Sequence, residues 1–178
     1  MNELKEFIEN YAQSKPAKMR KPPYRKPESV KELERLHFEH KRKKHPDMPF
    51  PVRTKFEDMT ANGLTRCVIE YLQLHGHQAE RINVIGRPID NSHAFTDCIG
   101  RQRRIGSMKW IPSGSTPGSA DVSATIRGRS VKIEVKTVRD RQSEHQRKYQ
   151  RQIEQAGGKY IIISSFDDFI EQITNIIN

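Results

Sequence analysis

Two β-rich runs separated by a short glycine-containing turn constrain the fold more than any other part of this 178-residue chain. The runs cover residues 121–126 and 130–137, and Arg127-Gly128-Arg129 between them is typical of a β-hairpin turn. Downstream, the sequence predicts a polar helix that ends at a Gly-Gly pair, a short apolar strand and an amphipathic closing helix, over residues 140–155, 160–164 and 166–177. A hairpin followed by helix, strand and helix is typical of a small α/β domain.

The residues before the hairpin add a helix and a strand. Residues 60–75 predict a helix because apolar residues recur there with helical spacing, at Leu64, Cys67, Val68, Tyr71, Leu72 and Leu74. Thr60 or Asn62 is suited to cap its start. Residues 77–85 alternate between apolar and polar side chains and predict a strand.

The segment between this strand and the hairpin is polar and rich in glycine. We expect a long loop over residues 90–116, with one short strand at 108–111. Trp110 either belongs to the core or stacks on a nucleobase. Its arginines, Arg101, Arg103 and Arg104, either contact phosphates or are solvated. The complete order of elements predicts an α/β fold with a mixed central sheet flanked by helices.

Positive charge and proline concentrate in the first third of the chain. Residues 1–55 hold 15 Lys and Arg against 8 Asp and Glu, and seven of the ten prolines. Two short helices are expected there, at 3–12 and 28–44, but their apolar residues are too sparse for a wide apolar stripe. We therefore predict a basic, weakly packed arm over 1–55 and a folded domain over 56–178. The arm either contacts phosphates or is a solvated or protein-docking tail.

The composition excludes several classes of protein. Two cysteines, Cys67 and Cys98, are too few for a disulfide framework or a Cys-rich zinc site. No apolar run reaches the roughly 18 to 20 residues that span a bilayer, and the N-terminus lacks the apolar segment of a signal peptide. We therefore expect an intracellular, cytoplasmic protein without a membrane partner, whose net charge of +10 favours a polyanion.

Asp121, Glu134 and Lys136 form the pattern that carries chemistry. Side chains alternate along a strand, so Glu134 and Lys136 point to the same face, and the hairpin places Asp121 roughly opposite one of them. Two carboxylates that converge repel each other unless a cation lies between them, which favours Mg²⁺ or Mn²⁺. A lysine beside such a cation can orient or deprotonate a water. The alternative is a surface hairpin with a weak salt bridge.

The order of these residues resembles the signature of the PD-(D/E)xK nuclease superfamily. Gly118-Ser119-Ala120-Asp121 is followed, after a hairpin, by Glu134-Val135-Lys136. Over about residues 60–175 the chain is similar to one branch, the virus-type replication-repair nucleases (VRR-NUC domains). The other positions that carry this similarity are Glu70-Tyr71-Leu72, Gly76, Arg81, Asn83, Gly86, Arg141, Gln146, Tyr149 and Gly157-Gly158.

The resemblance implies a restriction-endonuclease-like core and a role for each matching residue. Asp121 and Glu134 are expected to bind Mg²⁺, with Mn²⁺ as a substitute, together with the backbone carbonyl of Val135. Lys136 is expected to be the catalytic lysine. The positions expected to contact the substrate or orient the site are Arg81, Asn83, Arg141 and Gln146.

One position departs from the pattern of this branch, which usually has a glutamate seven residues before the position of Glu70. Here that position is Gly63, with Asn62 beside it. Either Asn62 takes the role with a neutral oxygen, or Glu70 contributes from further along the helix, or the site holds one metal loosely. Glu70 is otherwise a solvated helix residue.

The resemblance implies a Mg²⁺-dependent DNA endonuclease that cuts branched, flapped or junction DNA in replication, repair or recombination. This branch is frequent in phages and mobile elements. Junction cutting would need two active sites and hence a homodimer, which rests on analogy. The alternatives are a catalytically inactive DNA-binding protein on a nuclease fold, and an assembly protein whose basic arm wraps a partner.

Overall fold

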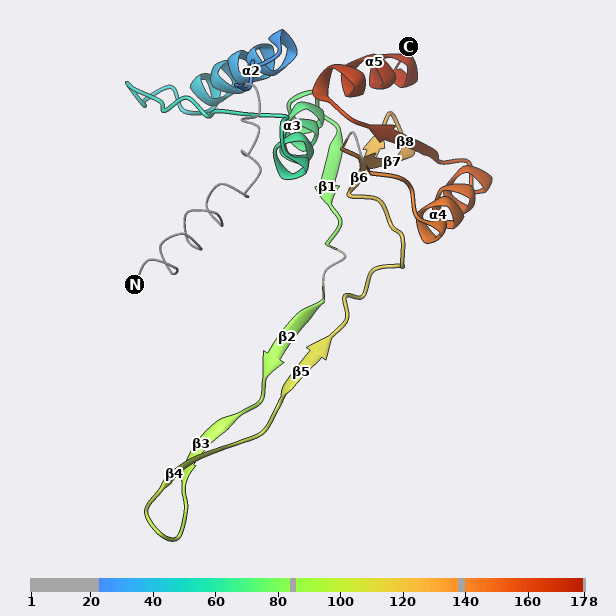
Figure 1. The fold of residues 1–178 in the computed structure, drawn as a ribbon. Helices are drawn as coiled ribbons and strands as arrows, with labels where there is room; N and C mark the ends of the chain where they lie inside the picture. Colours follow the sequence, from blue (N-terminus) through green and yellow to red (C-terminus); the bar gives the residue numbers. More distant parts are fainter. Residues whose placement is uncertain (1–22, 84–85, 138–139, 178) are drawn as a thin grey trace, which may run out of the picture.

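The computed structural model describes residues 23–83, 86–137 and 140–177, which form a mixed α/β fold (Figure 1). In chain order the elements are α2 (Glu28–Lys44), α3 (Ala61–Leu74), β1 (Gln78–Arg81), β2 (Arg87–Asp90), β3 (His93–Thr96), β4 (Gln102–Ile105), β5 (Met108–Ile111), β6 (Val122–Ile126), β7 (Arg129–Val135), α4 (Glu144–Gln155), β8 (Lys159–Ile163) and α5 (Phe166–Ile177). The helix expected at 3–12 lies outside the described residues. Within them, no helix is both long enough and apolar enough to cross a membrane.

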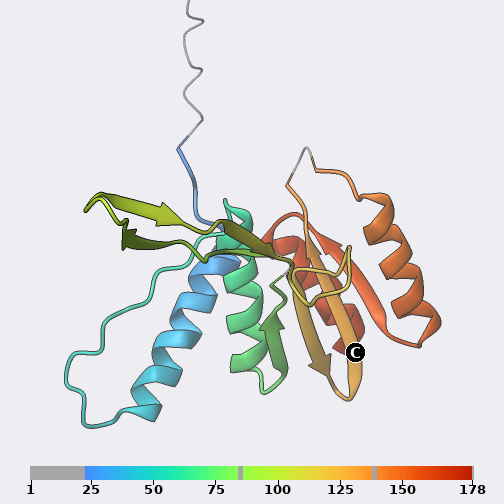
Figure 2. The ribbon, with the colours of Figure 1, turned by 90° about the horizontal axis from the view of Figure 1, so that it is seen from below.

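A four-stranded mixed sheet lies at the centre, in the order β1-β6-β7-β8. The first three strands pair antiparallel, whereas β8 runs parallel to β7. A parallel pair needs a crossover connection, and α4 provides it. Figure 2 shows α3 beside β1 at one end of the sheet and α4 beside β8 at the other. The expected mixed α/β sheet flanked by helices is therefore present.

The expectation of a weakly packed N-terminal arm is wrong for α2. Val30 and Leu33 are buried in the same core cluster as the sheet, together with Phe56. Residues three apart share one face of a helix, so this pair suffices to dock α2 although its apolar stripe is narrow. The helix packs against α3 and α5. The basic residues Lys41, Arg42, Lys43 and Lys44 occupy its last turn.

The long loop expected at 90–116 is instead a β-hairpin arm, which we define as residues 87–111. In this arm β2 pairs with β5 and β3 pairs with β4, and Figure 1 shows it extending away from the central sheet. None of its residues is buried, so the alternation of apolar and polar side chains that marks a half-buried strand is absent. Trp110 is 60% exposed and does not belong to the core.

Capping side chains set the ends of two helices. Thr60, not Asn62, caps α3, because its hydroxyl accepts a hydrogen bond from the Gly63 backbone N–H at 3.0 Å. The helix expected at 140–155 begins only at Glu144, because Ser143 and Gln146 form a capping box there. The strand expected at 77–85 is shorter and corresponds to β1. The expected closing helix at 166–177 is confirmed.

Candidate catalytic site

The β6–β7 hairpin brings Asp121 and Glu134 together. Its turn has Arg127 at φ 49° and Gly128 at φ 78°, the two consecutive positive values of a type I′ turn. This turn fixes the register in which Val122 faces Ile133, and continuing that register by one residue places Asp121 beside Glu134. One carboxylate oxygen of Asp121 also accepts a hydrogen bond from the Val135 backbone N–H at 2.9 Å.

Glu134 is a carboxylate buried to 3% exposure. Its Oε1 lies 3.0 Å from the Lys136 ammonium nitrogen and accepts a hydrogen bond from the Gln146 amide, while Oε2 accepts one from the Tyr160 hydroxyl at 3.3 Å. Burial raises the pKa of Glu134, the charge of Asp121 raises it further, and the hydrogen bond from Lys136 opposes both effects. The two carboxylates are therefore close enough to repel each other.

Gln146 joins the start of α4 to Glu134 of β7 and to Lys136, the residue that follows this strand. Its amide N–H donates to Glu134, and its carbonyl oxygen accepts from the Lys136 ammonium group at 3.1 Å. The same oxygen accepts from the Ser143 backbone N–H at 2.9 Å as part of the capping box. One side chain thus both starts the helix and fixes the orientation of Glu134 and Lys136.

Gly118 allows the loop before Asp121 to lie against the start of α4. A β carbon at this position would lie 2.4 Å from the carbonyl carbon of His145 and 2.7 Å from the backbone nitrogen of Gln146. The residue also has φ +80°, which favours glycine. The loop that carries Asp121 and the helix that carries Gln146 therefore approach each other through backbone atoms.

The end of β1 lies next to Asp121 and carries Arg81, with Asn83 two residues further on. The Ile82 backbone N–H donates to the carbonyl of Asp121 at 2.8 Å, so the end of β1 borders the site. The Arg81 guanidinium donates to the Asn62 side-chain oxygen at 2.7 Å. The carbonyl of Asn83 accepts a hydrogen bond from the Ser115 hydroxyl at 3.3 Å.

Glu70 and Arg141 lie apart from this group of side chains. The Glu70 carboxylate lies 3.4 Å from the His37 imidazole on α2, so it faces that helix. It is eight residues from Asn62, or about 12 Å along α3. Arg141 is exposed in the segment between β7 and α4.

The sequence analysis missed one member of the site, Tyr160. Its position in an otherwise apolar strand predicted a core side chain, and it is indeed buried, but its hydroxyl donates to Glu134. The register of β7 with β8 pairs Tyr160 with Lys132, two residues before Glu134 and on the same face. This contact follows from the parallel pairing of β7 with β8. The two strands are far apart in the sequence, so local patterns do not indicate it. Burial and the neighbouring Glu134 charge raise the pKa of Tyr160.

The donor atoms at the site are those that a hard divalent cation prefers. Asp121, directly before β6, and Glu134, in β7, supply carboxylate oxygens, and the backbone carbonyls of these segments are close by. Among the described residues no group of three or more His, Cys, Asp and Glu side chains gathers. A cation held here would therefore be bound by two carboxylates, a backbone carbonyl and water or substrate oxygens.

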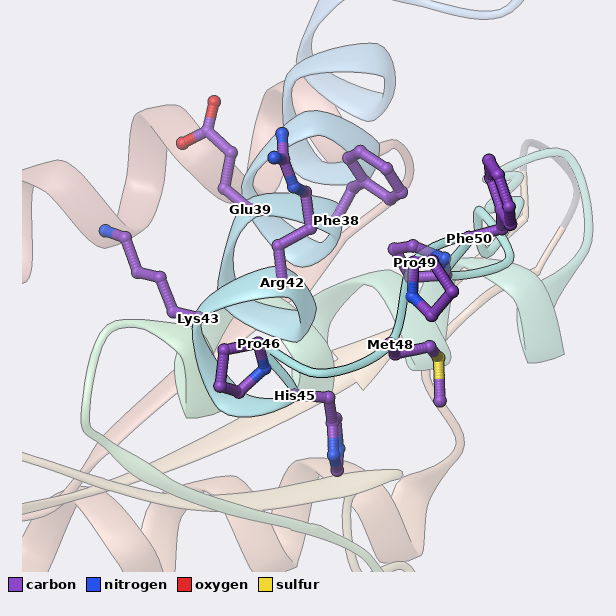
Figure 3. A pocket seen from close by; sticks show the side chains of 10 residues that line it. Phe38, Glu39, Arg42, Lys43, His45, Pro46, Met48, Pro49 and Phe50 are labelled. Carbon is purple, nitrogen blue, oxygen red and sulfur yellow. The ribbon is translucent and has the colours of Figure 1, made fainter.

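A groove elsewhere in the molecule contains none of the candidate catalytic residues. A groove of about 780 Å³ lies between the end of α2 and the proline-rich segment that follows it (Figure 3). Its lining includes Phe38, Arg42, Met48 and Phe50, and the Phe50 side chain is 89% exposed. The groove has no carboxylate pair and is not a second candidate for the catalytic site.

Comparison with known proteins gave no match to a family model, to a curated protein or to a solved structure.

Proposed function

We propose that this protein is a Mg²⁺-dependent DNA endonuclease with a restriction-endonuclease-like core. The observation that supports this function best is the arrangement of Asp121, Glu134 and Lys136. Two carboxylates lie side by side on the hairpin, and the lysine nitrogen is 3.0 Å from one of them. The resemblance to the VRR-NUC nucleases supports structure-selective cutting of branched or flapped DNA in replication, repair or recombination.

Each residue has a role that follows from its surroundings. A bound Mg²⁺ or Mn²⁺ would supply a Lewis acid that neutralises the scissile phosphate and lowers the pKa of a water molecule. Asp121, Glu134 and the carbonyl of Val135 would hold the cation. Lys136 would release Glu134 to the cation and use its ammonium group to orient the attacking water or to stabilise charge on the phosphate.

Gln146 and Arg81 would act on geometry and substrate binding. Gln146 donates to Glu134 and accepts from Lys136, so it holds the carboxylate and the lysine at a fixed separation. Arg81, whose guanidinium donates to Asn62 of α3, would contact a DNA phosphate at the end of β1. Arg141 and Asn83, which the resemblance implies contact the substrate, would do so from the segments that follow β7 and β1.

A second candidate function is a DNA-binding protein on a nuclease fold that has lost cleavage. One observation favours it, namely that the site has no third carboxylate from α3 among the described residues. Glu70 faces His37 instead, and Asn62 is a neutral amide that accepts from Arg81. Without a cation, the paired carboxylates of Asp121 and Glu134 would repel a phosphate. This repulsion argues for the enzyme.

The test is cleavage of labelled single-stranded, blunt duplex, flapped and four-way DNA with Mg²⁺, Mn²⁺ or EDTA. Asp121→Asn and Lys136→Ala are expected to lose cutting by at least 100-fold. Asp167→Asn and Lys159→Ala are matched controls, since both side chains are exposed, and they are expected to cut as the wild type does. Salt-sensitive binding without cutting in either metal would instead support the inactive DNA-binding protein.

A separate measurement tests the oligomeric state. Cutting both strands of a four-way junction requires two active sites, so we propose a homodimer for that substrate. Sedimentation of the protein with and without junction DNA measures it directly. Cutting of flaps by a monomer would remove the reason for a dimer.

A further inference from the structure

Trp110 is the single tryptophan of the chain, and it lies exposed at the base of the β-hairpin arm. It pairs across the ribbon with Pro88, and the register places Met108 on the same face. The indole ring lies over Gly86, where a β carbon would be only 2.6 Å from the ring nitrogen. Trp110 at 60% and Met108 at 67% exposure thus form an apolar platform that the domain does not cover.

A groove runs from this platform along the loop that leads to Asp121. It has a volume of about 470 Å³, and its lining runs from Trp110 past Pro112, Thr116 and Pro117 to Gly118. Gly118 is the residue whose backbone touches the start of α4, next to Gln146. The volume suits a nucleobase with its sugar, and the far end of the groove lies three residues before Asp121.

Positive charge lies on the other face of the β-hairpin arm and near its tip. Arg87 and Lys109 lie on the opposite face of the same ribbon, and Arg101 lies near its tip. Arg103 and Arg104 are neutralised within the arm by Asp97 and Asp90, at 2.6 Å and 2.8 Å. In the part of the chain that the structure describes, Arg87, Arg101 and Lys109 form no ion pair. They are therefore available to phosphates.

We propose that Trp110 and this groove bind an unpaired nucleobase of the DNA strand that enters the catalytic site. An exposed indole stacks on any base because every base has a π face. The unpaired cations on the other face and near the tip of the β-hairpin arm can contact phosphates further along the same strand. This inference rests on the proposed function for the identity of the ligand. It adds a substrate class, namely DNA with unpaired nucleotides beside the scissile phosphate.

The single tryptophan reports on this contact directly. The full-length protein in EDTA is titrated with single-stranded, flapped and blunt duplex oligonucleotides while its fluorescence is recorded. Stacking is expected to quench Trp110 with the single-stranded and flapped DNA and to leave it largely unchanged with the blunt duplex. Absence of quenching despite binding, or equal quenching by the blunt duplex, overturns the inference.

Variants separate stacking from other effects. Trp110→Ala is expected to weaken binding of flapped DNA by roughly 5- to 100-fold, measured by anisotropy of a labelled oligonucleotide, while Trp110→Phe keeps most of the affinity. Phe50→Ala is the matched control, because Phe50 is an exposed aromatic residue outside both the β-hairpin arm and the candidate catalytic site. Equal affinities of Trp110→Ala and the wild type overturn the proposal.

The outcomes distinguish this inference from the proposed function. Quenching and a Trp110→Ala defect without any cleavage support the groove and overturn the nuclease. Metal-dependent cleavage with no effect of Trp110→Ala supports the nuclease and overturns the groove. Fluorescence that changes with protein concentration alone shows that a second copy covers Trp110, which also overturns the nucleobase site.

Discussion

Replacing Lys136 by methionine tests the electrostatics of the candidate site without any substrate. The variant removes the cation 3.0 Å from the Glu134 carboxylate, which is 3% exposed. Breaking a buried ion pair costs about 3–5 kcal/mol because it leaves a charge unpaired. The Lys136 side chain is 16% exposed, and hydrogen bonds from Gln146 and Tyr160 to Glu134 remain. We therefore expect a loss of about 2–3 kcal/mol in the free energy of unfolding.

The assay is thermal unfolding in EDTA at pH 7.5, followed by circular dichroism. For a chain of this size the loss corresponds to a decrease of about 4–12 °C in Tm. Glu134→Gln removes the buried charge and keeps polar atoms for its neighbours, so its unfolding free energy should change by less than about 1 kcal/mol. The double variant should resemble Glu134→Gln, which gives a coupling energy of about 2 kcal/mol between the two residues.

The stability deficit of Lys136→Met should change with pH in a definite direction. The folded-state pKa of Glu134 is raised, chiefly by burial, so the folded protein binds this proton more tightly than the unfolded chain. Its contribution to stability is present below the usual pKa of about 4.5 and is lost as the pH rises through the raised value. The deficit of Lys136→Met should therefore be largest at neutral pH and fade in acid. A Tm equal to wild type at pH 7.5, or a deficit that persists below pH 4, would refute this reasoning.

Three further variants and one thiol reagent test the packing of the fold. Gly118→Ala should lose about 2 kcal/mol or more, since it combines a positive φ with a backbone clash, and urea unfolding measures it. Gly63→Ala should lower Tm although alanine favours helices by about 1 kcal/mol, and a rise would contradict the close contact at that position. Leu33→Ala should lose about 2–5 kcal/mol in the same urea assay, whereas a surface helix would lose almost nothing. Burial raises the pKa of Cys67 to about 12, so a thiol reagent at pH 8 should modify exposed Cys98 quickly and Cys67 only on unfolding; equal rates would contradict its burial.

The parts of the fold that the sequence predicted well are those with local signals. The turn at Arg127-Gly128 and the alternation on both sides of it indicated the hairpin, and the spacing of Phe166, Phe169 and Ile173 indicated the closing helix. Both depend on contacts between residues close in sequence. The structure places Asp121 opposite Glu134, one of the two registers that the sequence left open.

The parts that the sequence did not predict depend on long-range contacts or lack burial. The strands of the β-hairpin arm have no buried face, so their sequence shows no alternation of apolar and polar side chains. This segment was therefore expected to be a loop. α2 contributes only Val30 and Leu33 to the core, and such a narrow stripe does not differ from that of a solvated helix. Tyr160 reaches Glu134 only through the parallel pairing of β7 with β8.

Packing gives a physical reason for glycine at position 63, where the VRR-NUC pattern has glutamate. A β carbon there would lie 2.5 Å from the carbonyl oxygen of Glu57, so the chain before α3 fills the space that a side chain would need. That chain is held in place by buried Phe56 and by the Cys67 thiol, which donates to the same carbonyl at 3.3 Å. The glycine is therefore coupled to the docking of the N-terminal segment. In our proposal the cation must consequently rely on the two carboxylates of the hairpin, which favours a single, weakly held metal ion that DNA phosphate oxygens help to bind.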